Sequence, residues 1–101
     1  MTKTISQSAN SKTSYFFDVS CRKFYGILIS GGTQWHQGQV GLKFKLKHYG
    51  SGITFYVSDL KQAKAEDFVK CDPIFSGNFR VEVIVITAVA FTNAIIGVVF
   101  E

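Results

Sequence analysis

The side chains that could do chemistry are few and lie scattered along the chain. Its 101 residues include two cysteines, two histidines and seven carboxylates. A nucleophilic site would need Cys21 or Cys71 beside His36 or His48, with a carboxylate to orient the histidine. None of these residues lies in a nucleophile elbow, a dyad spacing or a glycine-rich phosphate loop. We therefore expect a protein that is not an enzyme.

The cysteines and histidines also lack the spacing of a metal site. There is no CxxC pair, and His36 and His48 lie too far apart in sequence for one helical face. We expect neither a metal nor a cofactor. The N-terminal segment has no apolar signal-peptide core, so the expected location is the cytoplasm with both cysteines reduced. A single bridge between Cys21 and Cys71 stays open as the alternative.

Composition predicts one packed domain. The chain is 47% hydrophobic with ten Phe and only 18% charged residues, which is typical of a globule with one modest core. Residues 1–13 are mainly polar, and we expect a flexible tail there, followed by a single β-rich domain over residues 14–101. The net charge of +4 is compatible with a nucleic acid or an acidic partner but requires neither.

Short apolar runs separated by turn residues predict a mainly β fold of the α+β class. Two strands are expected at Tyr15–Val19 and Phe24–Ile29, and a hairpin pairs Leu42–His48 with Ile53–Val57. Asp59 and Gln62 have the spacing of a capping box, which predicts one short α-helix near residues 60–70. The expected architecture is a compact antiparallel sheet, sandwich or barrel of about six to seven strands.

The segment Leu42–His48 has the clearest local pattern, because apolar residues alternate with lysines. In a strand this alternation places all the lysines on one face. Two interpretations stay open: the lysines contact a phosphate backbone, or they protect an exposed sheet edge from aggregation. The candidate face for a nucleic acid or an acidic partner comprises Lys43, Lys45, Lys47, Arg22, Lys23, Trp35 and Tyr49.

Aromatic side chains could add stacking to this face. The candidates are Tyr25, Trp35, Tyr49 and Tyr56. Trp35, next to His36, has two further interpretations, a sugar-stacking ring or a core anchor.

The C-terminal stretch, Val81–Phe100, is apolar almost throughout and has no charge after Glu82. A membrane helix is one interpretation, but the Val, Ile, Phe and Thr content and the break at Thr92-Asn93 favour two strands. Ser76-Gly77-Asn78 predicts a turn before this stretch, and Phe79, Val81, Val83 and Val85 are expected to face the core. Both strands nevertheless have two apolar faces, which is more apolar surface than one small domain with a short helix can cover. We therefore expect an oligomer interface at Ile84, Ile86, Ile95 and Val99, which Ile84→Lys should dissociate.

Two function classes follow from these patterns. The first is a small non-enzymatic interaction protein that self-associates through its C-terminal strands and binds a protein partner. The alternative is a single-stranded nucleic acid-binding protein that uses the lysine strand and exposed aromatic rings.

Overall fold

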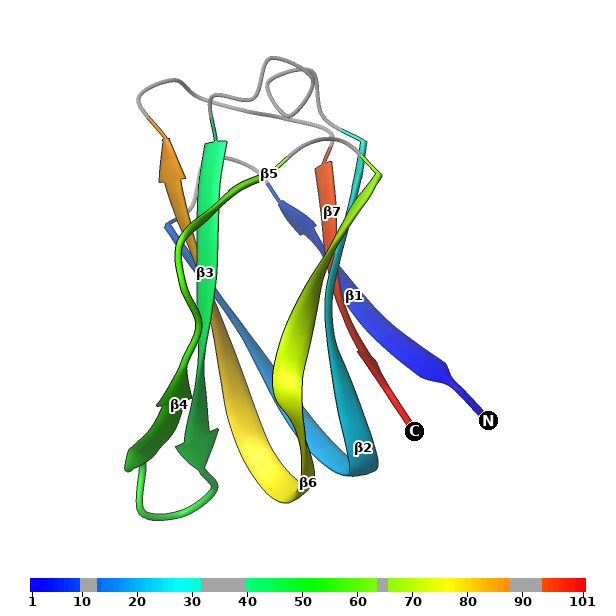
Figure 1. Cartoon of the computed structure of the whole chain (residues 1–101), viewed down its shortest axis with the longest axis vertical. Helices are drawn as coiled ribbons and strands as arrows, with labels where there is room; N and C mark the ends of the chain where they lie inside the picture. Colours follow the sequence, from blue (N-terminus) through cyan, green and yellow to red (C-terminus); the bar gives the residue numbers. More distant parts are fainter. Residues whose placement is uncertain (10–12, 32–39, 64–65, 88–93) are drawn as a thin grey trace.

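The computed structural model describes residues 1–9, 13–31, 40–63, 66–87 and 94–101. In these residues the fold is mainly β, with antiparallel pairing throughout (Figure 1). The strands are β1 (Lys3–Ala9), β2 (Ser14–Gly31), β3 (Val40–His48), β4 (Thr54–Val57), β5 (Lys61–Ala63), β6 (Asp67–Thr87) and β7 (Ala94–Phe100). Their order in the sheet is β1-β7-β2-β6-β3-β4, and β5 also pairs with β3.

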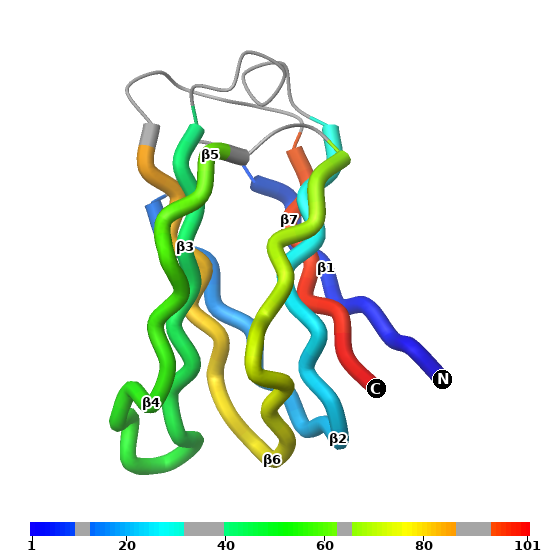
Figure 2. Tube along the Cα trace, viewed as in Figure 1, coloured from blue at the N-terminus to red at the C-terminus, as the bar shows by residue number. Residues whose placement is uncertain are grey.

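The two long strands, β2 and β6, belong to two layers at once. The first half of β2 pairs with the second half of β6, so that Tyr15 lies opposite Val83. The second half of β2 pairs with the first half of β6, so that Leu28 lies opposite Phe68. Both strands fold back at the lower end of the molecule (Figures 1 and 2).

This folded ladder makes a two-layer sandwich. The first half of β2 and the second half of β6 continue into β3, β4 and β5, and we call this group the β3 layer. The second half of β2 and the first half of β6 continue into β7 and β1, which form the β7 layer.

The bend in β2 is a bulged region rather than a loop. The pairing register shifts between Cys21 and Phe24. The amides of Arg22 and Lys23 donate to the carbonyl of Glu101 at 2.7 and 3.2 Å, and the Glu101 amide donates back to Lys23 at 2.8 Å. Bulges increase the local twist and bend of a strand, which lets one strand serve both layers. The C-terminal residue thus holds the bend in place.

The sequence prediction of separate strands at these bends is wrong. The polar residues 20–23 lie within β2, and the predicted turn Ser76-Gly77-Asn78 lies within β6. Gly77 has a φ of 119° and pairs with Cys21, so a residue that suits a turn here forms the bend of a continuous strand.

The core lies between the two layers. In the β3 layer, Leu42, Phe44 and Leu46 are fully buried, as their alternation with lysines predicts. The predicted inner face of β6 is also confirmed, since its alternate residues Phe79, Val81, Val83 and Val85 are buried. Phe24 joins the layers, because its ring makes edge contacts with Phe79 at 5.5 Å and with Phe44 at 6.1 Å.

The predicted helix near residues 60–70 is wrong, and the described part of the chain contains no helix. Lys61–Ala63 form β5, and the segment from Asp67 onward begins β6. Phe68 and Val69 pair with Leu28 and Ile27 of β2, so long-range pairing outweighs a local capping signal that is worth only about 1 kcal/mol. No helix that could span a membrane is present in the described ranges.

The N-terminal segment differs from the expected flexible tail. Residues 3–9 form β1 and pair with β7 along its whole length, from Lys3 opposite Phe100 to Ala9 opposite Ala94. The prediction of a flexible tail considered only how little apolar surface these residues can bury. Here the edge strand β7 supplies a ladder of backbone hydrogen bonds, which does not depend on apolar side chains. The predicted turn at Thr92-Asn93 lies outside the described residues, but strands occupy both flanks of it.

Gly26 offers a test of the tight packing in the β7 layer. Its φ is 151°, and a Cβ there would collide with the carbonyl oxygen of Val69. We expect Gly26→Ala to lower the free energy of unfolding by about 3 kcal/mol, the upper range for a strained backbone position. Gly77→Ala is the control, because Gly77 also has a positive φ but has no atom within 4 Å of the added Cβ. Its expected cost is about 1 kcal/mol in urea unfolding. Equal costs for both variants would contradict the packing at Gly26.

Candidate interaction surfaces

The outer face of the β3 layer carries the three lysines of β3. Lys43, Lys45 and Lys47 are half-buried and project opposite to the buried residues between them, as the sequence predicts. However, β3 is a central strand that pairs with β6 on one side and with β4 and β5 on the other. Protection of a sheet edge therefore does not explain these lysines.

Ion pairs neutralise part of this face. Lys47 Nζ lies 2.8 Å from Glu82 Oε1, and Ser14 Oγ donates to the second carboxylate oxygen at 3.3 Å. The hydrogen bond from Lys47 lowers the pKa of the Glu82 carboxyl. Arg80 binds Asp18 through two hydrogen bonds, at 2.8 and 3.3 Å, and this contact lowers the pKa of Asp18.

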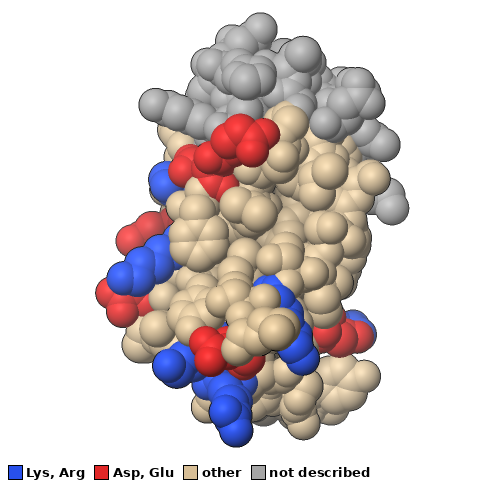
Figure 3. Space-filling view, turned by 90° about the vertical axis from the view of Figure 1, so that its right-hand side faces the viewer, with Lys and Arg blue, Asp and Glu red and all other residues tan. Residues whose placement is uncertain are grey.

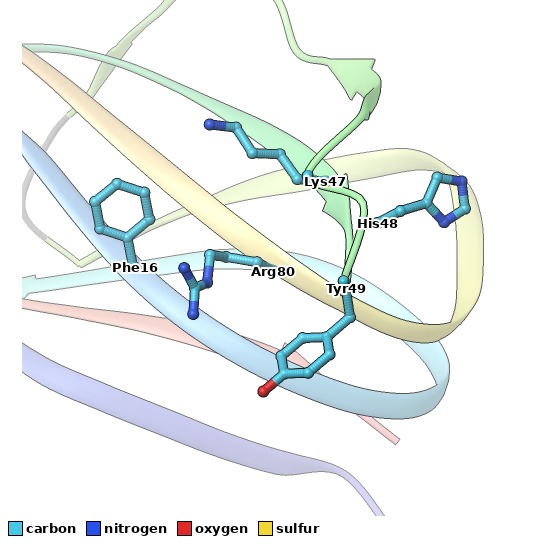
Figure 4. A pocket seen from close by; sticks show the side chains of 7 residues that line it. Phe16, Lys47, His48, Tyr49 and Arg80 are labelled. Atoms are coloured by element: carbon cyan, nitrogen blue, oxygen red, sulfur yellow. The ribbon is translucent and has the colours of Figure 1, made fainter.

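A hollow of about 310 Å³ lies at the lower end of the same face. It is lined by Phe16, Lys47, His48, Tyr49, Gly50, Gly52 and Arg80 (Figure 4). The guanidinium carbon of Arg80 lies 5.9 Å from the ring centroid of Phe16, within cation–π range. Tyr49, on the turn after β3, is 62% exposed, and Phe16 is 47% exposed.

The sequence-based candidate face did not include Phe16 or Arg80. For Phe16 a signal was available, because it has the same strand parity as the charged Asp18 and alternates with Tyr15, Phe17 and Val19, which are buried. His48 was a candidate partner for a nucleophilic cysteine. Its ring points away from the other labelled groups in Figure 4 and packs on Phe55, with the two ring centroids 4.6 Å apart.

Two further predicted members of the basic face, Arg22 and Lys23, lie at the bend of β2 and bond Glu101. Trp35 and His36 lie outside the described residues. Of the candidate stacking rings, Tyr25 donates its hydroxyl to Glu101 at 2.6 Å. Tyr56 packs on other aromatic rings, and its hydroxyl bonds the Asp72 carbonyl.

The outer face of the β7 layer is different, because apolar and small uncharged side chains make up most of it. One cross-strand row runs Phe68, Leu28, Gly97 and Ser6, from β6 through β2 and β7 to β1. The rows on either side place Lys70, Gly26, Val99 and Thr4 in line, and Ser30, Ile95 and Ser8 in line. Viewed from the right-hand side of Figure 1, the molecule shows a broad uncharged area, with charged side chains along one border and toward the lower end (Figure 3).

The four residues of the predicted oligomer interface lie on two different surfaces. Ile95 and Val99 belong to the outer face of the β7 layer, whereas Ile84 and Ile86 belong to the outer face of the β3 layer. A single contact with another chain cannot cover all four. The sequence indicated outward apolar positions, but it could not assign the two strands to separate layers.

The described residues contain no group of three or more His, Cys, Asp or Glu side chains that could hold a metal ion. Both cysteines are free thiols, and burial raises the pKa of Cys71 to about 11 and that of Cys21 above its ordinary value. Their thiolate fractions at neutral pH are correspondingly low.

Comparisons with protein families, curated proteins and solved structures found no match to this chain. The assignment of a function therefore depends on the two outer faces.

The Lys47–Glu82 pair predicts a pH-dependent stability. A carboxyl with a lowered pKa stabilises the fold above its unfolded value of 4.5, and this contribution disappears as pH falls through the lower folded value. We expect Glu82→Gln to lower the free energy of unfolding by about 1 kcal/mol at pH 7 and by a smaller amount at pH 3. Urea unfolding at both pH values measures this, with Asp59→Asn as an exposed control. A loss of equal size at both pH values would mean that packing, not charge, is responsible.

Proposed function

We propose that this chain is a non-enzymatic interaction protein that pairs with a second copy of itself through the outer face of the β7 layer. The observation that carries the proposal is the cluster of outward apolar side chains on three adjacent strands. Leu28 is 38% exposed, Phe68 39% and Ile95 47%, and Val99 beside them is half-buried. Contiguous apolar surface of this kind marks interaction sites in small soluble domains.

Because few charged groups lie on this face, removing it from water costs little free energy. Its charged groups lie at its borders. Lys70 and Glu66 lie on the β6 side, where Glu66 accepts hydrogen bonds from Ser30 Oγ and the Gly31 amide, and Glu101 lies at the lower end, 3.6 Å from the N-terminal amine. The outer face of the β3 layer, by contrast, carries Lys47, Glu82 and Arg80 among its charges. Burying unpaired charges costs several kcal/mol, so the β7 layer is the better face for contact with another copy.

The face is also complementary to itself in side-chain size. In the central row, Phe68 and Leu28 are large whereas Gly97 and Ser6 are small. A two-fold axis parallel to the strands, between β2 and β7, would place each row of one copy over the same row of the second copy, with the strand order reversed. Leu28 of one copy would then lie over Gly97 of the other, and Phe68 over Ser6.

The neighbouring row follows the same rule, since Ile95 would lie over Ser30 of the second copy. The depression over Gly97 that would receive Leu28 is shallow, because a Cβ at Gly97 would lie only 3.0 Å from Thr4 Cγ2. Two sheets that pack face to face with interdigitated large and small side chains form the interior of β-sandwiches, and the proposed contact repeats that packing between chains.

The size of the face sets the expected affinity. Four strands with seven residues each span about 19 Å by 23 Å, or about 440 Å². Stable specific interfaces bury about 800 Å² on each partner, so the pair should be weak and reversible, with a dissociation constant in the micromolar range.

Ile95→Lys tests the interface with a matched control. Ile95 and Ile86 are exposed to nearly the same extent, 47% and 49%, but they lie on opposite outer faces. At about 100 μM protein we expect light scattering to give a dimer mass for the unmodified chain and for Ile86→Lys. Ile95→Lys should give the single-chain mass of 11.2 kDa without loss of folded structure. Dissociation by Ile86→Lys alone would move the interface to the β3 layer.

Two parts of the sequence-based expectation stay predictions. They are the further protein partner and the cytoplasmic location.

A further inference from the structure

Two aromatic rings at the outer face of the β3 layer are exposed to solvent. Phe16 and Tyr49 line one hollow, with the Arg80 side chain between them (Figure 4). Arg80 stays in place because Asp18 holds two of its nitrogens, Nε and Nη2. Within the described ranges the remaining guanidinium protons have no hydrogen-bond acceptor, so they are available to an acceptor in the hollow. The site therefore combines flat apolar surface with fixed hydrogen-bond donors.

The same face has an excess of positive charge. Its cations are Lys43, Lys45, Lys47 and Arg80, and its carboxylates are Asp18 and Glu82. Among the described side chains, the ion pairs of this face hold Lys47 and Arg80. Lys43 and Lys45 are thus the cations available to an anion from outside.

The lysines form a line that leads to the hollow. Alternate residues of a strand lie about 6.6 Å apart, which matches an extended chain of phosphates better than a single compact anion. Lys47 lines the hollow itself, so the line of cations ends where the aromatic rings begin.

We propose that the outer face of the β3 layer binds single-stranded nucleic acid. Lys43 and Lys45 contact consecutive phosphates, and Phe16 and Tyr49 stack on bases that lie over the hollow beside Arg80. Stacking is available to every base, so the binding has little sequence preference. An acidic peptide would satisfy the lysines but would leave both rings unused, which is why we favour the nucleic acid.

The first experiment measures fluorescence anisotropy of a labelled oligothymidine of about 12 nucleotides at about 50 mM salt. The double variant Lys43→Gln with Lys45→Gln leaves both ion pairs of the face intact. We expect it to bind at least tenfold more weakly and to reduce the slope of log K against log salt by about 1.4. The control is Lys3→Gln with Lys70→Gln, which removes the same charge from the β7 layer and should change little.

The second experiment separates stacking from charge. Phe16→Ala and Tyr49→Ala should each weaken binding by about tenfold. Ile74→Ala, which removes an apolar side chain of matching exposure, 49% against 47% for Phe16, should have no effect. Duplex DNA of the same length should bind more weakly than the single strand, because its bases are already stacked.

Three results would overturn the proposal. They are no binding at low salt, equal losses for the test and control lysine pairs, and a labelled oligoglutamate that binds as tightly as the oligonucleotide and is indifferent to Phe16→Ala. Ile95→Lys should bind the oligonucleotide as the unmodified chain does, since the β7 layer lies on the other side. Failure of this proposal is therefore distinguishable from failure of the proposed dimer.

Discussion

The structure depends on one antiparallel ladder, between β2 and β6, that is folded over on itself. Each strand gives one half to each layer, and the bend at Cys21–Phe24 is held by backbone hydrogen bonds that Arg22 and Lys23 exchange with Glu101. Phe24, which directly follows the bulge, packs against Phe44 and Phe79 of the opposite layer. Without the bend, the inward faces of the two halves would have no partner, and the aromatic core could not close.

The same fold-over explains why the two outer faces differ in chemistry. The outward residues on the first half of β2 and the second half of β6 include Asp18 and Arg80, which pair with each other. Those on the remaining halves include Leu28 and Phe68, which lie side by side. One ladder thus supplies a charged face and an apolar face, on opposite sides of one small domain. The proposed self-association and the proposed nucleic acid site can therefore operate on one molecule without competing for surface.

Local alternation predicted the interior well, because burial on one side of a strand leaves a period-two pattern. Leu42, Phe44 and Leu46, and the inner residues of β6, were identified in this way. Turn residues were less informative, since Gly77 has the same backbone preference in a bend as in a loop. The sequence also could not show that Ile86 and Ile95 face opposite sides, because strand order is a property of long-range pairing. The N-terminal strand was missed for the same reason: its stability comes from the edge of β7.

The contact between two β7 layers is tested most directly by nuclear Overhauser effects between chains, in a sample that mixes labelled and unlabelled copies above the dissociation constant. The proposed two-fold arrangement predicts intermolecular cross-peaks from the Leu28 methyl groups to Gly97 and from the Ile95 methyl groups to Ser30. Intermolecular cross-peaks confined to Ile84 and Ile86, or none at any concentration, would contradict it.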